Sequence, residues 1–174
     1  MNFSLFVNIV FEDTKNRLWI GTDNGLNLLD RATGAFTHYR SDPNDPHSLA
    51  NDNIQTLFED QSGVLWFGTF GSGVDQYDPF KDKFIHLAAR PGTVQGLASD
   101  SIWAILEDAQ QNLWIGTMGG GLNRLDLTTG AWSYYTSDPT NRATLNSNFI
   151  FSIYQDRQGT YWVGTDQGIN RLDP

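Results

Sequence analysis

The feature that most constrains this chain is a short motif that recurs at a nearly constant interval. The motif is LWIGT or a close variant of it, and its four tryptophans are Trp19, Trp66, Trp114 and Trp162. Successive tryptophans are 47, 48 and 48 residues apart. Such regular self-similarity indicates a repeat architecture, in which each repeat buries its apolar surface against the next.

Other positions repeat in step with the tryptophan. One aspartate precedes each tryptophan by six residues: Asp13, Asp60, Asp108 and Asp156. A second aspartate follows it by 11 or 12 residues: Asp30, Asp78, Asp126 and Asp173. Because each aspartate falls in a predicted turn, we expect it to accept backbone hydrogen bonds rather than to bind a metal ion.

Each period contains four short apolar segments, which in the third repeat span residues 101–108, 112–117, 121–126 and 131–135. Segments of this length, rich in aromatic and branched residues, are typical of antiparallel strands. Residues suited to positive φ fall in the first turn (Asn16, Gly63, Gly159) and in the last (Gly34, Gly130). Two repeats depart from this, with Gln111 in the first turn of the third repeat and Asp82 in the last turn of the second. Four strands in each period predict an all-β fold made of β-propeller blades.

We place the blades at residues 1–48, 49–96, 97–144 and 145–174, with three strands in the last. The glycine run Gly119 to Gly121 could also be a phosphate-binding loop, but such a loop precedes a helix. Here a strand follows, so the sequence predicts a turn. The glycine after each Trp–apolar pair is expected to let a neighbouring backbone or indole approach closely.

Composition excludes several classes of function. The net charge of −9 argues against binding to nucleic acid or to an anionic membrane surface. Without cysteine there is no disulfide and no thiolate metal site. The apolar start, MNFSLFVNIVFED, has no basic region of the kind found in a signal peptide, and Phe3 to Asp13 reads as a first strand instead.

Positions that vary between equivalent places in the repeats are the candidates for ligand binding. They lie on the first strands, on the turns between the second and third strands, and on the segments that join blades. The candidates are Asn53, Gln55, Phe70, Ser101, Trp103, Met118, Asn148, Phe151 and Asp166. Polar groups interleaved with aromatic rings suit a sugar or a peptide; alternatively, they solvate loop ends and Trp103 fills a gap.

No catalytic residue, cofactor or metal site is expected. His38 and His86 occupy equivalent outer-strand positions about one repeat apart, and His47 lies in a proline-rich loop. Neither a nucleophile with an adjacent base nor a histidine pattern of a metal site is present.

The repeated pattern ED…LWIGT…GLN…LD resembles the two-component regulator propeller repeat. Two positions depart from it: Gln155 replaces a glutamate, and Asp75 replaces an asparagine. The resemblance implies a seven-bladed propeller in the periplasmic or extracellular sensor of a bacterial signalling receptor. We therefore expect non-catalytic recognition of a ligand or partner; a structural assembly module and a lyase-like enzyme are the alternatives.

Within these 174 residues, the first and last blades would have no lateral neighbour. Their tryptophan-bearing faces would expose apolar surface, which favours association. We expect a homodimer that completes a propeller, and a closed four-bladed monomer is the alternative.

Overall fold

The computed structural model describes residues 6–90 and 95–172, which form four antiparallel sheets in chain order, here named blades 1 to 4. Blade 1 contains β1 (Val7–Glu12), β2 (Leu18–Thr22), β3 (Gly25–Leu29) and β4 (Phe36–Tyr39). Blade 2 contains β5 (Ile54–Glu59), β6 (Leu65–Thr69), β7 (Val74–Asp78) and β8 (Lys83–Leu87). Blade 3 contains β9 (Ile102–Glu107), β10 (Asn112–Thr117), β11 (Leu122–Asp126) and β12 (Trp132–Tyr135). Blade 4 contains β13 (Ile150–Gln155), β14 (Tyr161–Thr165) and β15 (Gly168–Leu172).

The strands and turns agree with the repeat pattern, and the all-β propeller class is confirmed. In the third repeat, β10 has the same bounds as the segment predicted at residues 112–117. The bounds of β9, β11 and β12 differ from the predicted ones by at most one residue at either end. All seven turn residues named above have positive φ, including the non-glycines Asn16 (59°), Asp82 (52°) and Gln111 (61°). Across the described residues, the structure has no helix long and apolar enough to cross a membrane.

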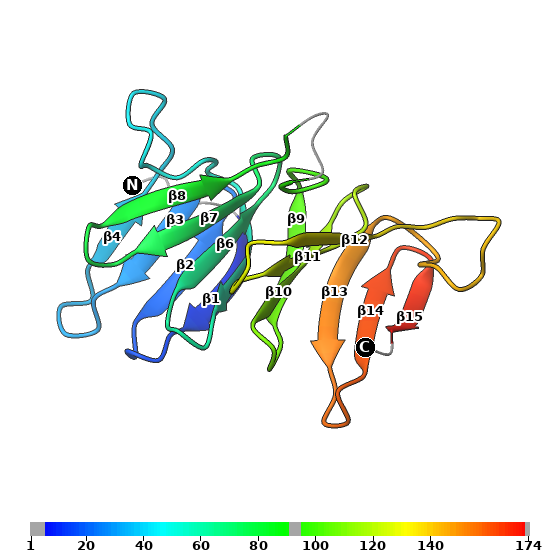
Figure 1. The fold of residues 1–174 in the computed structure, drawn as a ribbon. Helices are drawn as coiled ribbons and strands as arrows, with labels where there is room; N and C mark the ends of the chain where they lie inside the picture. Colours follow the sequence, from blue (N-terminus) through cyan, green and yellow to red (C-terminus); the bar gives the residue numbers. More distant parts are fainter. Residues whose placement is uncertain (1–5, 91–94, 173–174) are drawn as a thin grey trace.

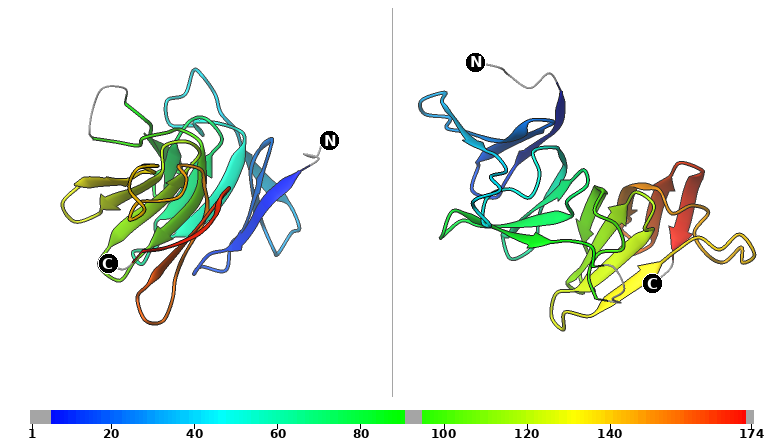
Figure 2. Two further views of the ribbon diagram at one scale, coloured as in Figure 1. Left: turned by 90° about the vertical axis from the view of Figure 1, so that its right-hand side faces the viewer. Right: turned by 90° about the horizontal axis from the view of Figure 1, so that it is seen from above.

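The four blades stand in a row, with blade 1 in blue at one end and blade 4 in orange and red at the other (Figure 1). The view from above shows the same order (Figure 2). First strands of adjacent blades contact each other: β1 with β5, β5 with β9, and β9 with β13. The first strand thus occupies the inner position of each blade. A ring of four blades closed within one chain is not the arrangement observed.

The core consists of three apolar clusters, each lying between two adjacent blades. We define the leading face of a blade as the side toward the preceding blade, and the trailing face as the side toward the next one. In the first cluster Trp19 and Leu26, on the trailing face of blade 1, pack with Leu57 and Phe67 of blade 2. Trp66 and Trp114 occupy the corresponding positions in the second and third clusters. Burial between blades is therefore the main source of stability.

Each motif tryptophan is hydrogen-bonded to the aspartate six residues before it. The indole Nε1 donates to the carboxylate at 2.8–2.9 Å in all four blades, as in Trp66 to Asp60. The other carboxylate oxygen accepts backbone N–H groups of the turn, as predicted. The sequence interpretation identified the turn role of the aspartate but missed its bond to the indole.

The expectation for the motif glycine needs a correction. The group that approaches Gly68 is neither a backbone nor an indole but the side chain of Ile102 in the next blade. A Cβ added at Gly68 would lie 2.7 Å from Cγ2 of Ile102, and 2.6 Å from Cγ2 of Thr56 in its own blade. Asp173 and residues 3–5 of the expected first strand lie outside the described residues.

Candidate functional site

The turns between second and third strands gather at one end of the inner strands, as expected. The turn residues Phe70 and Met118 each donate a backbone N–H at 2.9 Å to their own blade, to the carbonyls of Asn53 and Ser101. Each also forms a β-bridge to the next blade, Phe70 with Ser101 and Met118 with Phe149. The turns of blades 2 and 3 therefore each lie between two first strands, and they continue the face formed by the inner strands.

The segments between blades fix this face. The carbonyl of Asn148 accepts the N–H groups of Gly119 and Gly121, each at 3.0 Å, so the glycine run is a turn held by the next blade. The side-chain oxygen of Asn148 accepts the N–H of Ser137 at 2.7 Å. Asp100 makes the equivalent contacts one blade earlier: its carbonyl accepts the N–H groups of Gly71 and Gly73, and its carboxylate accepts the N–H of Ala89. Among the candidates, Asn148 thus has a structural bond that the sequence interpretation did not foresee.

Each inner strand contains an irregularity at the position that varies between repeats. Pairing with the second strand shifts between Val7 and Ile9, Ile54 and Thr56, Ile102 and Ala104, and Ile150 and Ser152. The residues inside these shifts are Asn8, Gln55, Trp103 and Phe151. A bulge frees a residue from regular pairing and redirects its side chain, and bulges are over-represented beside functional sites.

The bulge residues form an amide half and an aromatic half. Asn53 Oδ1 accepts hydrogen bonds from Gln55 Nε2 at 2.5 Å and from Asn8 Nδ2 at 3.4 Å. The rings of Trp103 and Phe151 meet edge to face, with centroids 5.4 Å apart. Adjacent inner strands thus present polar groups on blades 1 and 2 and aromatic rings on blades 3 and 4.

Trp103 has an unusual feature within this group. Its Nε1 is buried and has no hydrogen-bond partner in the described part of the chain, whereas the four motif indoles are all paired. A buried donor left unpaired costs about 1–3 kcal/mol. Phe151 beside it is 39% exposed. The repeat comparison identified Trp103 as variable, but neither its bulge nor its unpaired N–H could be read from the sequence.

The remaining candidates lie on the same face with different exposure. Phe70 is exposed at 45%, Met118 and Ser101 are half-buried, and Asp166 is exposed. The backbone N–H of Asp166 lies 3.4 Å from the Phe149 carbonyl, as expected for its place in the fourth turn. All nine candidates therefore lie on the inner strands or at their ends.

The histidines do not converge. His38 Nδ1 lies 2.6 Å from Oδ1 of Asn27. His86 lies between Asp75 Oδ1, at 2.5 Å from its Nδ1, and the Pro46 carbonyl, at 3.0 Å from its Nε2. Burial raises the pKa of Asp75, an effect that the hydrogen bonds from Ala50 N and His86 only partly offset. His86 therefore joins an outer strand to the segment preceding its blade.

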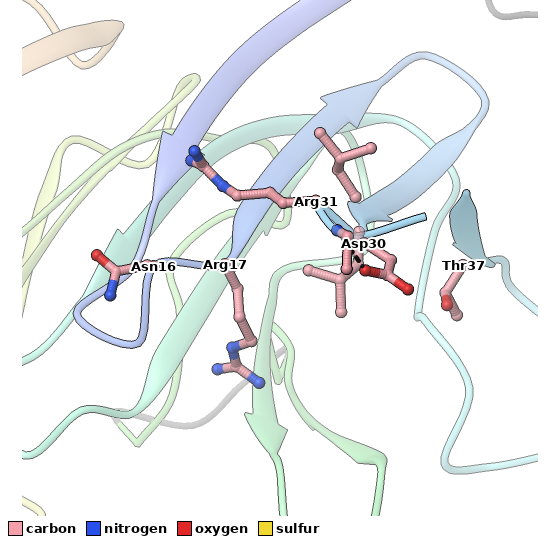
Figure 3. A pocket seen from close by; sticks show the side chains of 8 residues that line it. Asn16, Arg17, Asp30, Arg31 and Thr37 are labelled. Atoms are coloured by element: carbon pink, nitrogen blue, oxygen red, sulfur yellow. Dashed lines mark hydrogen bonds between the residues drawn. The ribbon is translucent and has the colours of Figure 1, made fainter. Parts of the chain in front are cut away.

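A depression of about 320 Å³ lies away from the inner strands, at the corner of blade 1 (Figure 3). Its lining includes Arg17 and Arg31, which extend in different directions. Both guanidinium groups are already paired, Arg17 with Asp13 at 2.6 Å and Arg31 with Glu12 at 3.0 Å. None of the nine candidates lines this depression.

Comparison with known proteins places these blades in a family. The family model described as two component regulator propeller matches residues 3–24, 48–71, 96–119 and 144–167, more than half of the chain. A 76-residue part of the chain, 40% of it, is 36% identical to histidine kinase P4 of Formosa agariphila and matches 5% of that protein.

Solved structures that resemble this chain agree with the match to the family model. The extracellular domain of a protein described as a hybrid two component system, BT3049 from B. thetaiotaomicron, is 26% identical with a TM-score of 0.82, over 99% of this chain and 23% of that one. The extracellular domain of BT4673 from the same organism, described as a one component system, is 25% identical with a TM-score of 0.76, over 95% of this chain and 21% of that one. The chain spans less than a quarter of these solved domains. It belongs to the two-component regulator propeller family.

Proposed function

We propose that this chain is a non-catalytic, ligand-recognising part of an extracytoplasmic sensor propeller, and that it recognises a carbohydrate at its inner-strand face. The observation that carries the proposal is the placement of the variable residues Asn8, Gln55, Trp103 and Phe151 at the bulge of each inner strand. The sensor context is supported by the family and by the extracellular domains that the chain resembles.

The chemistry of this face suits a sugar. An aromatic ring offers an apolar surface to the C–H face of a pyranose, and Trp103 and Phe151 supply two adjacent rings. Asn53 and Gln55 supply amides that both donate to and accept from hydroxyl groups.

The test is binding of a panel of oligosaccharides, measured by thermal shift and then by calorimetry. A ligand that binds only the folded chain adds RT ln(1 + [L]/Kd) to its free energy of unfolding and so raises the unfolding temperature. We expect Trp103→Ala to lose the shift and the heat of binding. The control is Trp132→Ala, which removes a half-buried tryptophan from the outer strand β12 and should leave binding unchanged. Equal binding by wild type and Trp103→Ala would overturn the proposed site, and a panel with no binder would overturn the carbohydrate assignment.

A further inference from the structure

One position on the outer strands carries a polar side chain with a ring in each of the first three blades: His38, His86 and Tyr134. In blades 2 and 3 this ring contacts the segment that precedes its blade. The hydroxyl of Tyr134 donates to the Gly96 carbonyl at 2.7 Å, and His86 Nε2 lies 3.0 Å from the Pro46 carbonyl. These two side chains therefore act as clamps between an outer strand and the segment before it.

The residue opposite this position on the third strand differs between the two blades. In blade 3 it is Asn123, whose Nδ2 donates to the Gly120 carbonyl at 3.2 Å. In blade 2 it is Asp75, whose side chain is fully buried and whose Oδ1 lies 2.5 Å from His86 Nδ1. Blade 3 therefore has a neutral clamp, a phenol beside an amide, whereas blade 2 has two ionisable groups in contact.

The two contacts of His86 require a definite number of protons. A backbone carbonyl only accepts hydrogen bonds, so Nε2 must carry a hydrogen to bond Pro46. An ionised carboxylate also only accepts, so the contact with Asp75 needs a hydrogen either on Nδ1 or on the carboxyl group. Both bonds together therefore need one proton more than a neutral imidazole beside a carboxylate provides.

Loss of that extra proton leaves one hydrogen for two acceptors. The His86 side chain is 30% exposed, so its protons exchange with solvent, whereas Asp75 is fully buried and an unpaired charge there is costly. Pro46 is exposed, and water can take the place of an imidazole at an exposed carbonyl. The remaining hydrogen therefore stays on Nδ1, and the bond to Pro46 is the one that is lost. Burial raises the pKa of Asp75, which agrees with a pair that retains its proton.

The contact with Pro46 holds a compact loop in place. Residues 41–48 lie between β4 and β5 and project from the row of blades (Figure 1). Inside this loop, the hydroxyl of Ser48 accepts one backbone N–H and donates to a backbone carbonyl, each at 2.8 Å. The N–H of Phe84 on the outer strand also donates to the His47 carbonyl at 2.9 Å. Because the bonds inside the loop do not involve the imidazole, opening the clamp changes the attachment of the loop rather than its shape.

Other ionisable groups lie on the elements around this pair: Asp78 on β7, Lys83 on β8, and Asp42, Asp45 and His47 in the loop. The three carboxylates each accept a backbone N–H two residues further along the chain. Within the described residues, none of these groups is hydrogen-bonded to Asp75 or His86. The protonation state of the clamp therefore belongs to Asp75 and His86.

We propose that Asp75 and His86 form a pH-sensitive clamp, which holds the loop 41–48 on blade 2 while the pair keeps its extra proton and releases Pro46 when that proton is lost. An imidazole in an unfolded chain loses its second proton at about pH 6.5. The folded pair retains this proton to higher pH, so above about pH 6.5 the folded chain binds more protons than the unfolded chain. The contribution of the clamp to stability is therefore complete below that pH and is lost as the pH rises.

The first test is an NMR titration of the wild-type chain from about pH 5 to about pH 9. The ring nitrogen signals report the protonation of each histidine, which separates His86 from His38 and His47. We expect the amide signals of residues 44–48 to shift with the same midpoint as the His86 ring, and Nδ1 of that ring to keep its hydrogen at high pH. A loop that does not respond to His86, or that follows His47 instead, would overturn the proposal.

The second test replaces the pair by the neutral residues of blade 3. In the chain with Asp75→Asn and His86→Tyr, the shift of the loop signals should disappear. The unfolding constant of wild type should rise by up to about tenfold per pH unit above about pH 6.5, because one proton is involved, and the double variant should lose this rise. His38→Gln is the matched control, because it removes the equivalent histidine beside the neutral Asn27, and it should keep both effects.

The two tests remain decisive together. A double variant that titrates like wild type would refute the role of the pair, and so would a loss of both effects in His38→Gln. If the double variant does not fold, the wild-type titration alone decides the matter. Neither measurement uses a ligand, so failure of the clamp leaves the proposed carbohydrate site untouched.

Discussion

At the scale of single residues, the repeated aspartate has a larger part than its place in a turn suggested. Asp108 accepts the indole N–H of Trp114 at 2.8 Å and the phenol of Tyr161, in the next blade, at 2.7 Å. Its other oxygen accepts the N–H of Asn112 at 2.9 Å. One carboxylate thus orders a turn, orients the main core residue and joins two blades. The spacing of six residues was visible in the sequence, but the bond to the indole required the three-dimensional fold.

This bonding predicts a dependence of stability on pH. Burial alone would raise the pKa of Asp108, but the hydrogen bonds from Trp114, Asn112 and Tyr161 outweigh it and hold the pKa below the ordinary value of 3.8. The folded chain therefore binds fewer protons than the unfolded chain as the pH falls below 3.8. The stabilisation is fully present above that value and is lost as the pH falls through the folded pKa.

The variant Asp108→Asn isolates this effect. At pH 7 it should lower the free energy of unfolding by about 2 kcal/mol or more, because hydrogen bonds to a charged acceptor are lost. Denaturant titrations of both proteins at pH 7 and pH 3 give the difference between them. We expect that difference to shrink at pH 3, because below pH 3.8 the carboxylate of the unfolded chain takes up a proton more readily than that of the folded chain. A difference of the same size at both pH values would contradict the assignment.

The tryptophans give a second prediction at this scale. Trp66 and Trp114 are 4% and 3% exposed between blades, so truncation to alanine should cost roughly 3–5 kcal/mol. Trp103 is half-buried and its N–H has no partner in the described residues, so Trp103→Ala should cost much less. Denaturant unfolding of the three variants measures this directly. Equal losses at Trp66 and Trp103 would mean that Trp103 serves the core rather than a ligand.

At the scale of strands and turns, local chemistry was sufficient to predict most of the structure. Short apolar segments separated by turn residues predicted the strands. Asn, Asp and Gly between these segments predicted the turns in which φ is positive. The role of Asp75 was not predictable in this way. Its Oδ2 accepts the N–H of Ala50, just as Asn123 Oδ1 accepts that of Ala98, and its Oδ1 is paired with His86. Asn27 makes the equivalent contact with His38, so the contact with the outer-strand histidine does not account for the aspartate at this position.

One turn contains a residue poorly suited to its backbone conformation. Gln111 has φ of 61° at a position where two other repeats have glycine. A left-handed conformation costs a residue with a Cβ about 1–2 kcal/mol. Gln111→Gly should therefore raise the free energy of unfolding by up to about 1 kcal/mol, even though it removes the exposed 3.2 Å bond from Thr128.

The neighbouring residue provides the control for this turn. Gln110 is exposed in the same turn and is not among the residues with positive φ. Gln110→Gly adds only flexibility to the unfolded chain and should lower stability. Chemical denaturation of the two variants beside wild type decides the point, and destabilisation by both substitutions would refute the role assigned to the backbone at Gln111.

At the scale of the whole molecule, the four sequence repeats were sufficient to predict the fold. The positions that differ between repeats indicated which residues could form the candidate site, but not how those residues are arranged. Equivalent positions could be compared within one chain, which separated the shared tryptophan and aspartate from the variable Gln55 and Trp103. The bulges that release those residues depend on pairing with the second strand, and the unpaired Nε1 of Trp103 depends on its neighbours in space. Neither property has a local sequence signature.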